Sequence, residues 1–360
     1  RAVRSPGSTL KPLIYGLAFD QGLAHPETLI EDRPSRFGTY QPKNFDHDWH
    51  GTVTIREALA QSLNIPAVKV LDAMGPVRLM SALESLGTAP ELPKDTAPTL
   101  AIALGGLGMK LDELATAYVA LARGGVPVKV SHLRDVSEGQ GPTPALSQRP
   151  LMSSAAAWQI SEILRHAPPP IAAKPGQIAF KTGTSYGHRD AWSVGYDGRH
   201  VIAVWVGRAD GQSIPGLNGR GHAAPLLFDA FQRLAAERTP LPPRPQGVLV
   251  AKGDALPQPL RRFEKTDETP QPVAGFRDPP IAFQFPIDRA EIAIDQVQPK
   301  LTARVEGGAL PLTWLVDGAP APIDGQSRQA TLEMPKAGFV RLTVIDAKGR
   351  TDHVRIRVRE

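Results

Sequence analysis

The sequence predicts an α+β domain followed by a small all-β domain. Segments with helical spacing come before and after a group of short apolar runs, a proline-dense stretch follows them, and strict alternation dominates beyond it. Helices on either side of consecutive strands are typical of an antiparallel sheet with separate helices, not of alternating βαβ units. We therefore place an α+β domain at residues 1–236, a proline-rich linker at 237–280 and an all-β domain at 281–360.

Helical patterns occur at several places in the first domain. Apolar residues recur at intervals of three and four between Leu10 and Leu17, directly after Pro6-Gly7, so the first helix is expected to begin near Ser8. The remaining helices are expected at Ile55–Leu63, Leu111–Arg123, Ser153–His166 and Ala224–Ala235.

Strand patterns lie between the last two of these helices and again in the tail. Apolar runs at Ile178–Phe180, Ala191–Tyr196 and Val201–Val206 predict strands, with the hairpin signal Asp197-Gly198 between the last two. The proline-rich linker is expected to be semi-rigid and partly extended. Alternating segments from residue 281 onward predict a small antiparallel sandwich of immunoglobulin-like type.

Composition excludes several classes of function. The chain has 360 residues, 41% of them hydrophobic, and a net charge of +5, which suits a packed core with a mildly basic surface. It contains no cysteine, so disulfides, thiolate chemistry and cysteine-based zinc sites are excluded. No apolar run is long enough to span a membrane, and no basic run with interleaved aromatics indicates nucleic-acid binding. Because the chain begins with Arg1, we expect a piece of a longer protein.

Three short motifs each occur once. They are Ser-x-x-Lys at Ser8–Lys11, Ser-x-Asn at Ser62–Asn64, and Lys-Thr-Gly at Lys181–Gly183, which Thr184 follows. Average composition predicts either of the first two roughly once in a chain of this length, and Lys-Thr-Gly in about one chain in ten. Singly they are weak signals, but their order and their places on fitting elements make the combination specific.

The first motif can activate a nucleophile. A serine hydroxyl is a weak nucleophile and needs an adjacent base. Residues three apart share a helix face, so Lys11 can reach the hydroxyl of Ser8, and the helix N-terminus favours negative charge there. Lys11 acts as a base only when neutral, and burial or a second cation, for which we expect Lys181, would lower its pKa. Pro12 has no N–H and deprives the Ser8 carbonyl of its helical partner, which predicts a local distortion.

The other motifs can complete the site. Ser62 and Asn64 follow an expected helix, in a loop that can deliver a hydroxyl and an amide. Gly183 would let a substrate backbone lie against its strand with no Cβ in the way. The backbone N–H of Thr184, together with that of Ser8, would form an oxyanion hole.

The motifs and the residues around them resemble the transpeptidase domain of class A penicillin-binding proteins. This resemblance implies the penicillin-binding/β-lactamase-like fold, with an antiparallel sheet and helices, for about residues 1–236. By position and strand pattern, the tail is similar to the small C-terminal domain of the penicillin-binding protein 1C branch. The segments that carry the first resemblance are Arg4–Pro12, Val53–Leu59, Ser62–Val68, Ala103–Gly106, Lys181–Ser185 and Asp190–Trp192.

The resemblance implies a peptidoglycan D,D-transpeptidase that forms an acyl-enzyme on Ser8, with Lys11 as acylation base and Ser62 as proton relay to the leaving amine. The implied substrate-binding residues are Asn64, for the donor's peptide amide, and Lys181, Thr182 and Thr184, for its terminal carboxylate. Implied partners are stem peptides ending in D-Ala-D-Ala, and β-lactams as inhibitors. For the tail, strand alternation and the proline-rich connection predict a wall or protein partner, such as a periplasmic protein. Neither a metal nor an organic cofactor is implied. The parent would be periplasmic, held by a membrane anchor and carrying a glycosyltransferase domain, both outside this chain.

Two other functions stay open. The same scaffold supports hydrolases, namely a D,D-carboxypeptidase or a β-lactamase, although no extra glutamate stands out as a base for water. A non-catalytic wall-binding module, with the tail as its active part, is disfavoured by the intact motifs. Gly183–Gly187 also matches the nucleophile elbow of α/β-hydrolases, but that motif requires a following helix where we predict a hairpin. Ser185 is therefore expected to be a pocket residue.

Overall fold

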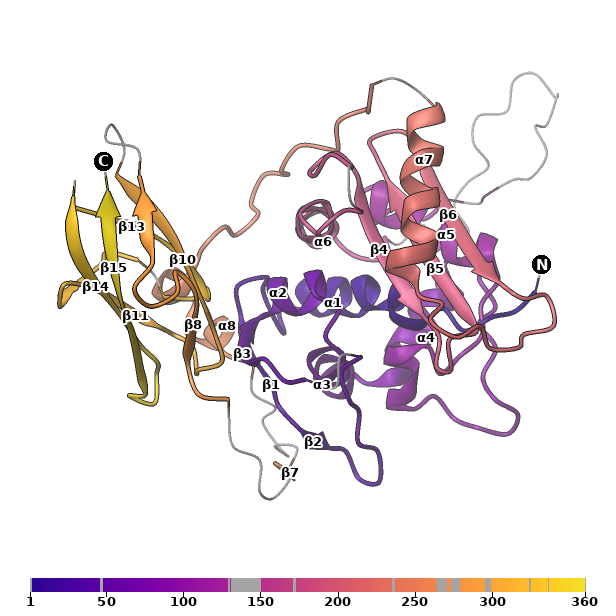
Figure 1. Ribbon diagram of the computed structural model, residues 1–360. Coiled ribbons are helices and arrows are strands. Elements are labelled where there is room, and N and C mark those ends of the chain that lie inside the picture. Colours follow the sequence, from indigo (N-terminus) through magenta and orange to yellow (C-terminus); the bar gives the residue numbers. More distant parts are fainter. Residues whose placement is uncertain are drawn as a thin grey trace. The chain divides into compact units, whose positions relative to one another are not determined.

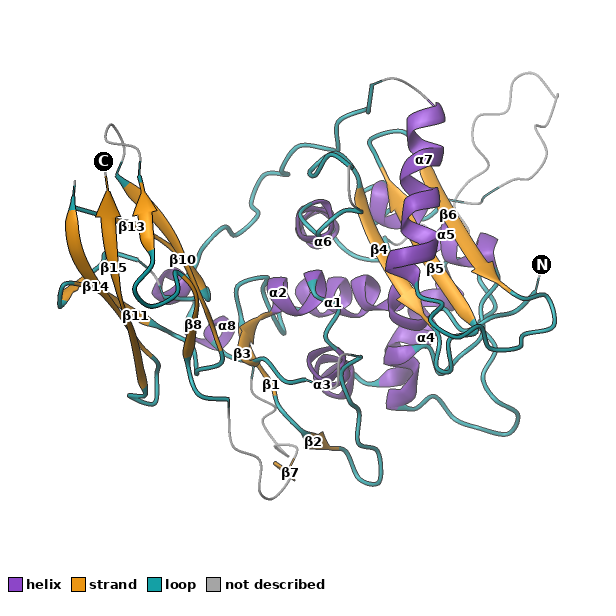
Figure 2. Ribbon diagram, viewed as in Figure 1, coloured by secondary structure: helices purple, strands orange, loops and turns teal. Residues whose placement is uncertain are grey.

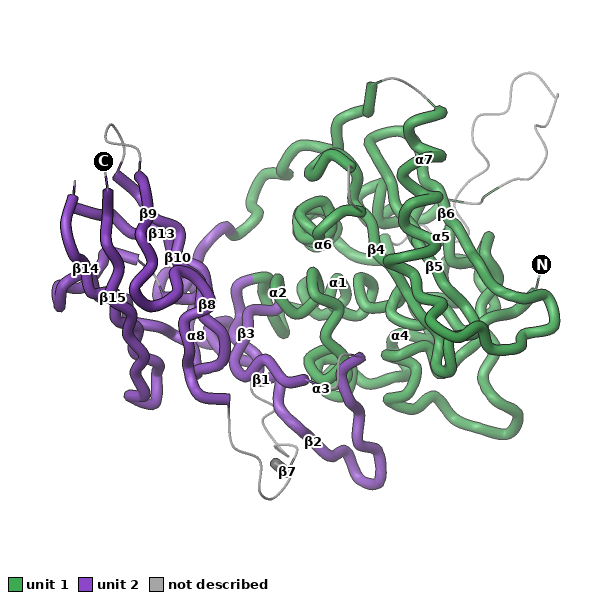
Figure 3. Tube along the Cα trace, viewed as in Figure 1, with its two compact units in different colours: residues 1–26, 56–249 green, residues 27–55, 250–360 purple. Residues whose placement is uncertain are grey.

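The chain folds into two compact units, which Figure 3 distinguishes by colour. The computed structural model describes residues 2–45, 48–128, 130, 150–170, 173–234, 237–263, 271–272, 279–294, 299–323, 325–335 and 337–359. The first unit comprises Arg1–Pro26 and Arg56–Leu249, and the second comprises Glu27–Ile55 and Val250–Glu360. These units do not coincide with the domains expected from sequence, so the boundaries at residues 236 and 280 stay a prediction.

Each helix that the sequence predicts in the first unit is present, and it begins and ends within three residues of its predicted bounds. Two others, α3 and α4, were not predicted, and Asn64 opens α3 instead of lying in a loop. Pro66 fits there because the N–H groups of a first helical turn have no partner within the helix. The helical segments are η1 (Gly7–Leu10), α1 (Lys11–Asp20), α2 (Ile55–Ala60), α3 (Asn64–Met74), α4 (Pro76–Ser85), η2 (Leu100–Leu104), α5 (Leu111–Ala122), α6 (Ser154–Arg165), the π-helical η3 (Gly219–Ala223) and α7 (Ala224–Leu234).

The sheet of the first unit has three antiparallel strands in the order β4-β5-β6. These strands are β4 (Ala179–Thr184), β5 (Asp190–Tyr196) and β6 (Val201–Gly207). Every residue of β5 is buried, because it is the middle strand and both α5 and α7 pack against it. Figure 2 shows α7 lying along this sheet. The α+β prediction is thereby confirmed for this unit.

Helix α1 is the centre of the first unit. Residues 11–19 are all buried, which is typical of a helix enclosed by other elements on every side. It contacts α3, α4, α6 and η2, and it follows η1 without a break (Figure 1). The residues at its N-terminus are therefore held by packing on all sides, which suits a site that needs fixed geometry.

The second unit joins residues 27–55 to the tail. There β1 (Leu29–Asp32) pairs with β3 (Gly51–Thr54), and β2 (Ser35–Arg36) pairs with β7 (Gln271–Pro272). The hydroxyl of Thr28 donates to the Leu260 carbonyl at 2.6 Å, and Arg328 Nη1 donates to the Thr52 carbonyl at 2.9 Å. Leu29 belongs to the same buried cluster as the tail strands. The proline-rich region also contains η4 (Gly253–Ala255) and α8 (Gln258–Arg261).

The tail strands form two sheets around one core. The first sheet has the order β13-β10-β8 and the second β12-β11-β14-β15-β9; all pairs are antiparallel except β9 with β15. Alternate residues of β10, β13, β14 and β15 are buried and meet in one cluster with Trp314. A sheet-rich tail is thereby confirmed. The bounds are β8 (Ala282–Phe285), β9 (Glu291–Ala293), β10 (Lys300–Glu306), β11 (Thr313–Val316), β12 (Ala319–Pro320), β13 (Gln329–Glu333), β14 (Gly338–Ile345) and β15 (Thr351–Arg359).

Candidate active site

Ser8 lies in the short 3₁₀ helix η1 that leads into α1. The distortion expected from Pro12 takes this form: the Ser8 carbonyl accepts from the N–H of Lys11, three residues on, instead of from residue 12, which has no N–H. The tighter turn satisfies the carbonyl and still leaves Ser8 at the helix N-terminus. Ser8 is half-buried, and within the described residues its hydroxyl makes no hydrogen bond.

The segment before Ser8 is fixed from three sides. Arg4 and Met109 exchange backbone hydrogen bonds of 3.0 and 2.9 Å. The indole N–H of Trp192 donates to the Ser5 carbonyl, and the Ser5 hydroxyl donates to the Gly105 carbonyl, both at 2.7 Å. β5 and the η2 region thereby hold the nucleophile segment. Local patterns do not predict these contacts, because they join positions 100 or more residues apart.

Two glycines let η1 approach strand β4. A Cβ added at Gly183 would lie 2.5 Å from the Pro6 carbonyl oxygen, and one added at Gly7 would lie 2.5 Å from that of Thr184. Gly7 also has a φ of +55°, which favours glycine. The space beside Gly183 is thus filled by the nucleophile segment. The absence of a Cβ at Gly183 therefore brings Ser8 up to β4. The reason predicted from sequence was a different one, namely room for a substrate backbone.

Lys11 reaches the second motif from the first turn of α1. Its side chain is fully buried, and its Nζ donates to the Ser62 carbonyl oxygen and to Asn64 Oδ1, both at 2.6 Å. The Ser62 hydroxyl lies 3.5 Å from the same nitrogen. Asn64, expected to bind a substrate amide, therefore also holds Lys11. No Lys11–Ser8 hydrogen bond occurs among the described residues, and in unliganded sites such catalytic contacts are often long.

Ser62 has a strained backbone. Its φ is +64°, in the left-handed region that glycine normally occupies. Helix α2 ends there in a Schellman motif: the N–H of Leu63 donates to the Ala58 carbonyl at 2.8 Å and that of Ser62 to the Leu59 carbonyl at 3.1 Å. A serine at the usual glycine position points to a requirement for its hydroxyl.

Lys181 meets the same hydroxyl from strand β4. Its Nζ donates to Ser62 Oγ at 2.7 Å and to the Thr182 carbonyl at 3.0 Å. Burial lowers the pKa of Lys181 to about 7. The sequence predicts Lys181 as a cation acting on Lys11, and the structure adds that Lys181 itself can lose its proton near neutral pH. The three motifs are thus connected through Ser62.

Thr184 lies at the free edge of the described sheet, next to Gly7 and Ser8. Directly after β4, the N–H of Ser185 donates to the Asp190 carbonyl at 3.0 Å. Because such bonds alternate along an antiparallel pair, the N–H of Thr184 points away from β5, toward η1. This direction suits an oxyanion hole with the Ser8 N–H. The Thr184 hydroxyl accepts from the Gly219 N–H at 3.1 Å.

The competing motifs do not form sites within the described residues. Ser185 is buried, its Oγ accepts from the Asp190 N–H at 2.9 Å, and β5 follows it instead of the helix that an elbow requires. Elsewhere in the chain, His50 Nδ1 lies 3.0 Å from Asp32 Oδ2. In the part of the chain that the structure describes, no three His, Asp or Glu side chains gather as they would around a metal ion.

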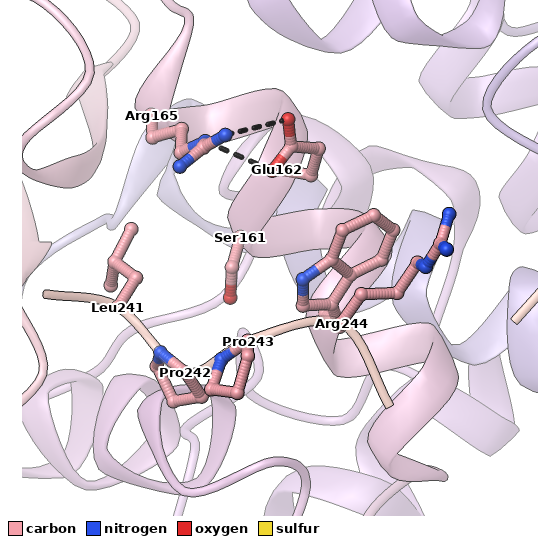
Figure 4. A pocket seen from close by; sticks show the side chains of 8 residues that line it. Ser161, Glu162, Arg165, Leu241, Pro242, Pro243 and Arg244 are labelled. Atoms are coloured by element: carbon pink, nitrogen blue, oxygen red, sulfur yellow. Dashed lines mark hydrogen bonds and ion pairs between the residues drawn. The ribbon is translucent and has the colours of Figure 1, made fainter. Parts of the chain in front are cut away.

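A separate pocket lies between α6 and the start of the proline-rich segment (Figure 4). Its wall includes Ser161, Leu241 and Arg244, and Arg165 pairs with Glu162 Oε2 at 2.9 Å. The Ser161 hydroxyl bonds to that of Tyr196 at 2.8 Å, so it serves to join α6 to the sheet. None of the three motifs lines this pocket.

The site thus places two lysines around the hydroxyl of one serine, Ser62. A family model described as "Penicillin binding protein transpeptidase domain" matches residues 1–226, and one described as "Penicillin-Binding Protein C-terminus Family" matches residues 271–356. The chain belongs to the penicillin-binding protein transpeptidase family. The prediction of a penicillin-binding transpeptidase domain is thereby confirmed.

Two curated relatives and two solved structures illustrate the similarity. Penicillin-binding protein 1C of Escherichia coli is 47% identical over 69% of this chain and 32% of its own length. Penicillin-binding protein 1B of Vibrio cholerae is 30% identical over 69% of this chain and 33% of its own length. The chain thus spans about a third of these relatives.

Among solved structures, penicillin-binding protein 1A of Haemophilus influenzae aligns with a TM-score of 0.57 at 20% identity, covering 71% of this chain and 46% of that one. PonA1 of Mycobacterium tuberculosis, in complex with penicillin V, aligns at 0.56 and 23% identity over 69% and 73%. These two alignments support the fold. None of the helices within the described residues has the length and apolar character needed to cross a bilayer.

Proposed function

We propose that this chain catalyses D,D-transpeptidation through an acyl-enzyme on Ser8. The observation that carries the proposal is the convergence of Lys11 and Lys181 on Ser62, with Asn64 bonded to Lys11, directly beside the helix that bears Ser8. The substrate class is a peptidoglycan stem peptide ending in D-Ala-D-Ala. β-Lactams, which imitate that bond, are the corresponding inhibitors.

In the acylation step, Ser8 Oγ attacks the carbonyl carbon of the penultimate D-Ala. Neutral Lys11 takes the hydroxyl proton as the Oγ–C bond forms. The carbonyl oxygen becomes an oxyanion that the N–H groups of Ser8 and Thr184 stabilise. Its collapse breaks the C–N bond and leaves an ester on Ser8.

Ser62 serves the leaving group. The departing D-Ala amine needs one proton, and the Ser62 hydroxyl can pass it while Lys181, 2.7 Å away, replaces it. A lysine whose pKa is about 7 exchanges protons readily at neutral pH. In the second half-reaction an acceptor amine attacks the ester, gives up a proton by the same route in reverse, and releases the Ser8 hydroxyl.

The donor would lie along the free edge of β4. Asn64 would bind its peptide amide, and Lys181, Thr182 and Thr184 its terminal carboxylate. Gly183 allows η1 to pack close to this strand, because a Cβ there would lie 2.5 Å from the Pro6 carbonyl oxygen. The lysine and threonine donors suit a carboxylate because charge-assisted hydrogen bonds are stronger than neutral ones.

The cellular setting is part of the proposal. Relatives named penicillin-binding proteins 1B and 1C are about twice as long as this chain, so its parent would carry a glycosyltransferase domain and a membrane anchor and act in the periplasm. The tail would be an immunoglobulin-like sandwich, supported by its two sheets around one core, and would contact a partner outside the active site.

A hydrolase on the same scaffold is the second candidate. Serine hydrolases of this type need a base that activates water against the ester. The two candidates differ in the acceptor that attacks the ester, which is water for a hydrolase and an amine for a transpeptidase.

Release of D-Ala from a diacylated Lys-D-Ala-D-Ala peptide tests the proposal. With a D-amino acid present as acceptor, the chain should release D-Ala and form the exchanged peptide, and Ser8→Ala should abolish both. Release with water alone as acceptor, at an undiminished rate, would favour the hydrolase. No release from peptide, ester or thioester donors would contradict both.

A further inference from the structure

The outer face of the second tail sheet is strongly basic. Along β14 and β15, alternate residues are exposed, and Figure 1 shows these strands side by side in the tail. On the exposed face, β15 carries three arginines in a row, at intervals of two residues or about 7 Å. The exposed basic residues of this face are Arg341, His353, Arg355, Arg357 and Arg359.

Two of these arginines face each other directly. Arg341 of β14 is the register partner of Arg355 of β15. Like charges directly opposite each other on a sheet destabilise it, so folding alone does not favour this pair. Within the described residues neither guanidinium forms an ion pair; Asp317 and Asp288 accept the backbone N–H groups of Arg341 and Arg355. Glu291 pairs instead with Arg357 and Arg359, at 3.4 and 2.6 Å.

The other tail sheet shows the opposite arrangement. On its exposed face, Lys300 of β10 is the register partner of Glu333 of β13. Arg304 is opposite Gln329 and donates to its side chain at 3.3 Å. One face of the sandwich is therefore balanced in charge and the other is not. The excess of positive charge therefore lies on one surface and does not come from the composition of the whole tail.

An exposed aromatic lies beside the arginines. Phe339 is 72% exposed at the start of β14, and the Arg357 guanidinium lies 5.7 Å from its ring centre. A single exposed aromatic is common on protein surfaces, but this one adds an apolar ring to the row of arginines. A sugar ring can stack on such an aromatic, and the arginine forks can bind carboxylates beside it.

We infer that the face formed by Phe339, Arg341, Arg355, Arg357 and Arg359 binds an anionic glycan, namely wall polymer whose peptide carboxylates meet the arginines. This rests on the proposed function, because the same polymer carries the donor peptides. Binding through the tail raises the effective concentration of those peptides at Ser8 without any change in the active site. The contacts are charge-assisted and therefore weaken as salt concentration rises.

Co-sedimentation of the whole chain with purified peptidoglycan sacculi tests the inference. The face variant Arg341→Gln/Arg355→Gln should raise the apparent Kd about tenfold and flatten its salt dependence. The matched control Lys300→Gln/Arg304→Gln removes the same charge from the balanced face and should change the Kd less than about twofold. Since it relieves a like-charge pair, the face variant should melt at the wild-type temperature or about 1–3 °C above it. If it melts lower, the single variant Arg355→Gln takes its place.

Several results would overturn the inference. They are no sedimentation of the wild-type chain, equal losses in the two variants, or no loss in the face variant. A further contradicting result is that the face variant weakens binding to vesicles of equal parts phosphatidylglycerol and phosphatidylcholine but leaves binding to sacculi unchanged. Labelling by a fluorescent penicillin, measured on the same samples, separates this inference from the proposed function. Intact labelling with unaltered sedimentation removes only the glycan site, and absent labelling challenges only the catalytic proposal.

Discussion

We predict from the backbone conformation of Ser62 that Ser62→Gly loses activity and is nevertheless more stable than the matched variant Ser62→Ala. Ser62 has a φ of +64° and occupies the glycine position of the Schellman motif that ends α2. Ser62→Gly relieves this strain, whereas Ser62→Ala keeps it. Both variants lose the same hydroxyl and therefore the 2.7 Å bond from Lys181.

The difference between the two variants isolates the backbone strain. Holding a non-glycine residue in the left-handed region costs about 1–2 kcal/mol, and glycine gives back part of this through its more flexible unfolded state. We expect Ser62→Gly to be more stable than Ser62→Ala by about 1 kcal/mol, or about 2–4 °C in Tm for a unit of this size. The lost hydrogen bond, worth about 1 kcal/mol, cancels in the comparison.

Both variants should acylate with a β-lactam at least about a hundredfold more slowly, because each lacks the hydroxyl that connects the lysines. The assay pairs thermal melts of the whole chain with stopped-flow acylation by a fluorescent penicillin. Equal melting temperatures, or a higher one for Ser62→Ala, would refute the strain argument. A glycine variant that keeps wild-type acylation would refute the role of the hydroxyl.

Four further predictions rest on contacts described above. Gly183→Ala places a Cβ 2.5 Å from the Pro6 carbonyl oxygen and should slow acylation at least about tenfold. In the control Gly221→Ala, the new Cβ meets only a side chain, at 3.3 Å, and acylation should be unchanged. Equal effects of the two variants in an acylation assay would contradict this prediction. Burial lowers the pKa of Lys181 to about 7, so binding of a carboxylate-bearing β-lactam at pH 8 should take up as much as one proton. Calorimetry in buffers of different ionisation enthalpy measures this uptake. If no proton is taken up, Lys181 does not bind the carboxylate in this way. Because the unfolded state binds more protons between about pH 7 and pH 10, stability should rise with pH across that window, and Lys181→Met should remove that part of the slope. Deleting residues 280–360 removes the cluster that buries Leu29, so amide hydrogen exchange in residues 27–55 should accelerate at least about tenfold. Unchanged protection from exchange would show that this segment folds without the tail.

Local signals made most of the first unit predictable. The helices at Lys11–Asp20 and Leu111–Ala122 and the strands around Asp197-Gly198 follow from periodicity and turn residues within a few positions. The three motifs identified the residues that meet at the site, because the chemistry restricts residue type and spacing. Even Pro12 was informative, since the loss of one N–H predicts a distortion near Ser8, although not its 3₁₀ form.

Contacts between distant parts of the sequence were not predictable in this way. The positive φ of Ser62 depends on how α2 ends and on where α3 begins, and serine itself gives no sign of it. The true neighbour of Gly183 is Pro6, more than 170 residues away. Residues 27–55 join the tail through Leu29 and Arg328, a partnership that alternation and proline content do not reveal.

The central claim is that Ser8 is the residue that becomes acylated, and site mapping after labelling tests it most directly. The whole chain is incubated with a fluorescent penicillin, digested and analysed by mass spectrometry. We predict one stable ester on the peptide that contains Ser8, no label in Ser8→Ala, and acylation slower by roughly two to four powers of ten in Lys11→Ala. Label on Ser185, or label that persists in Ser8→Ala, would contradict the account.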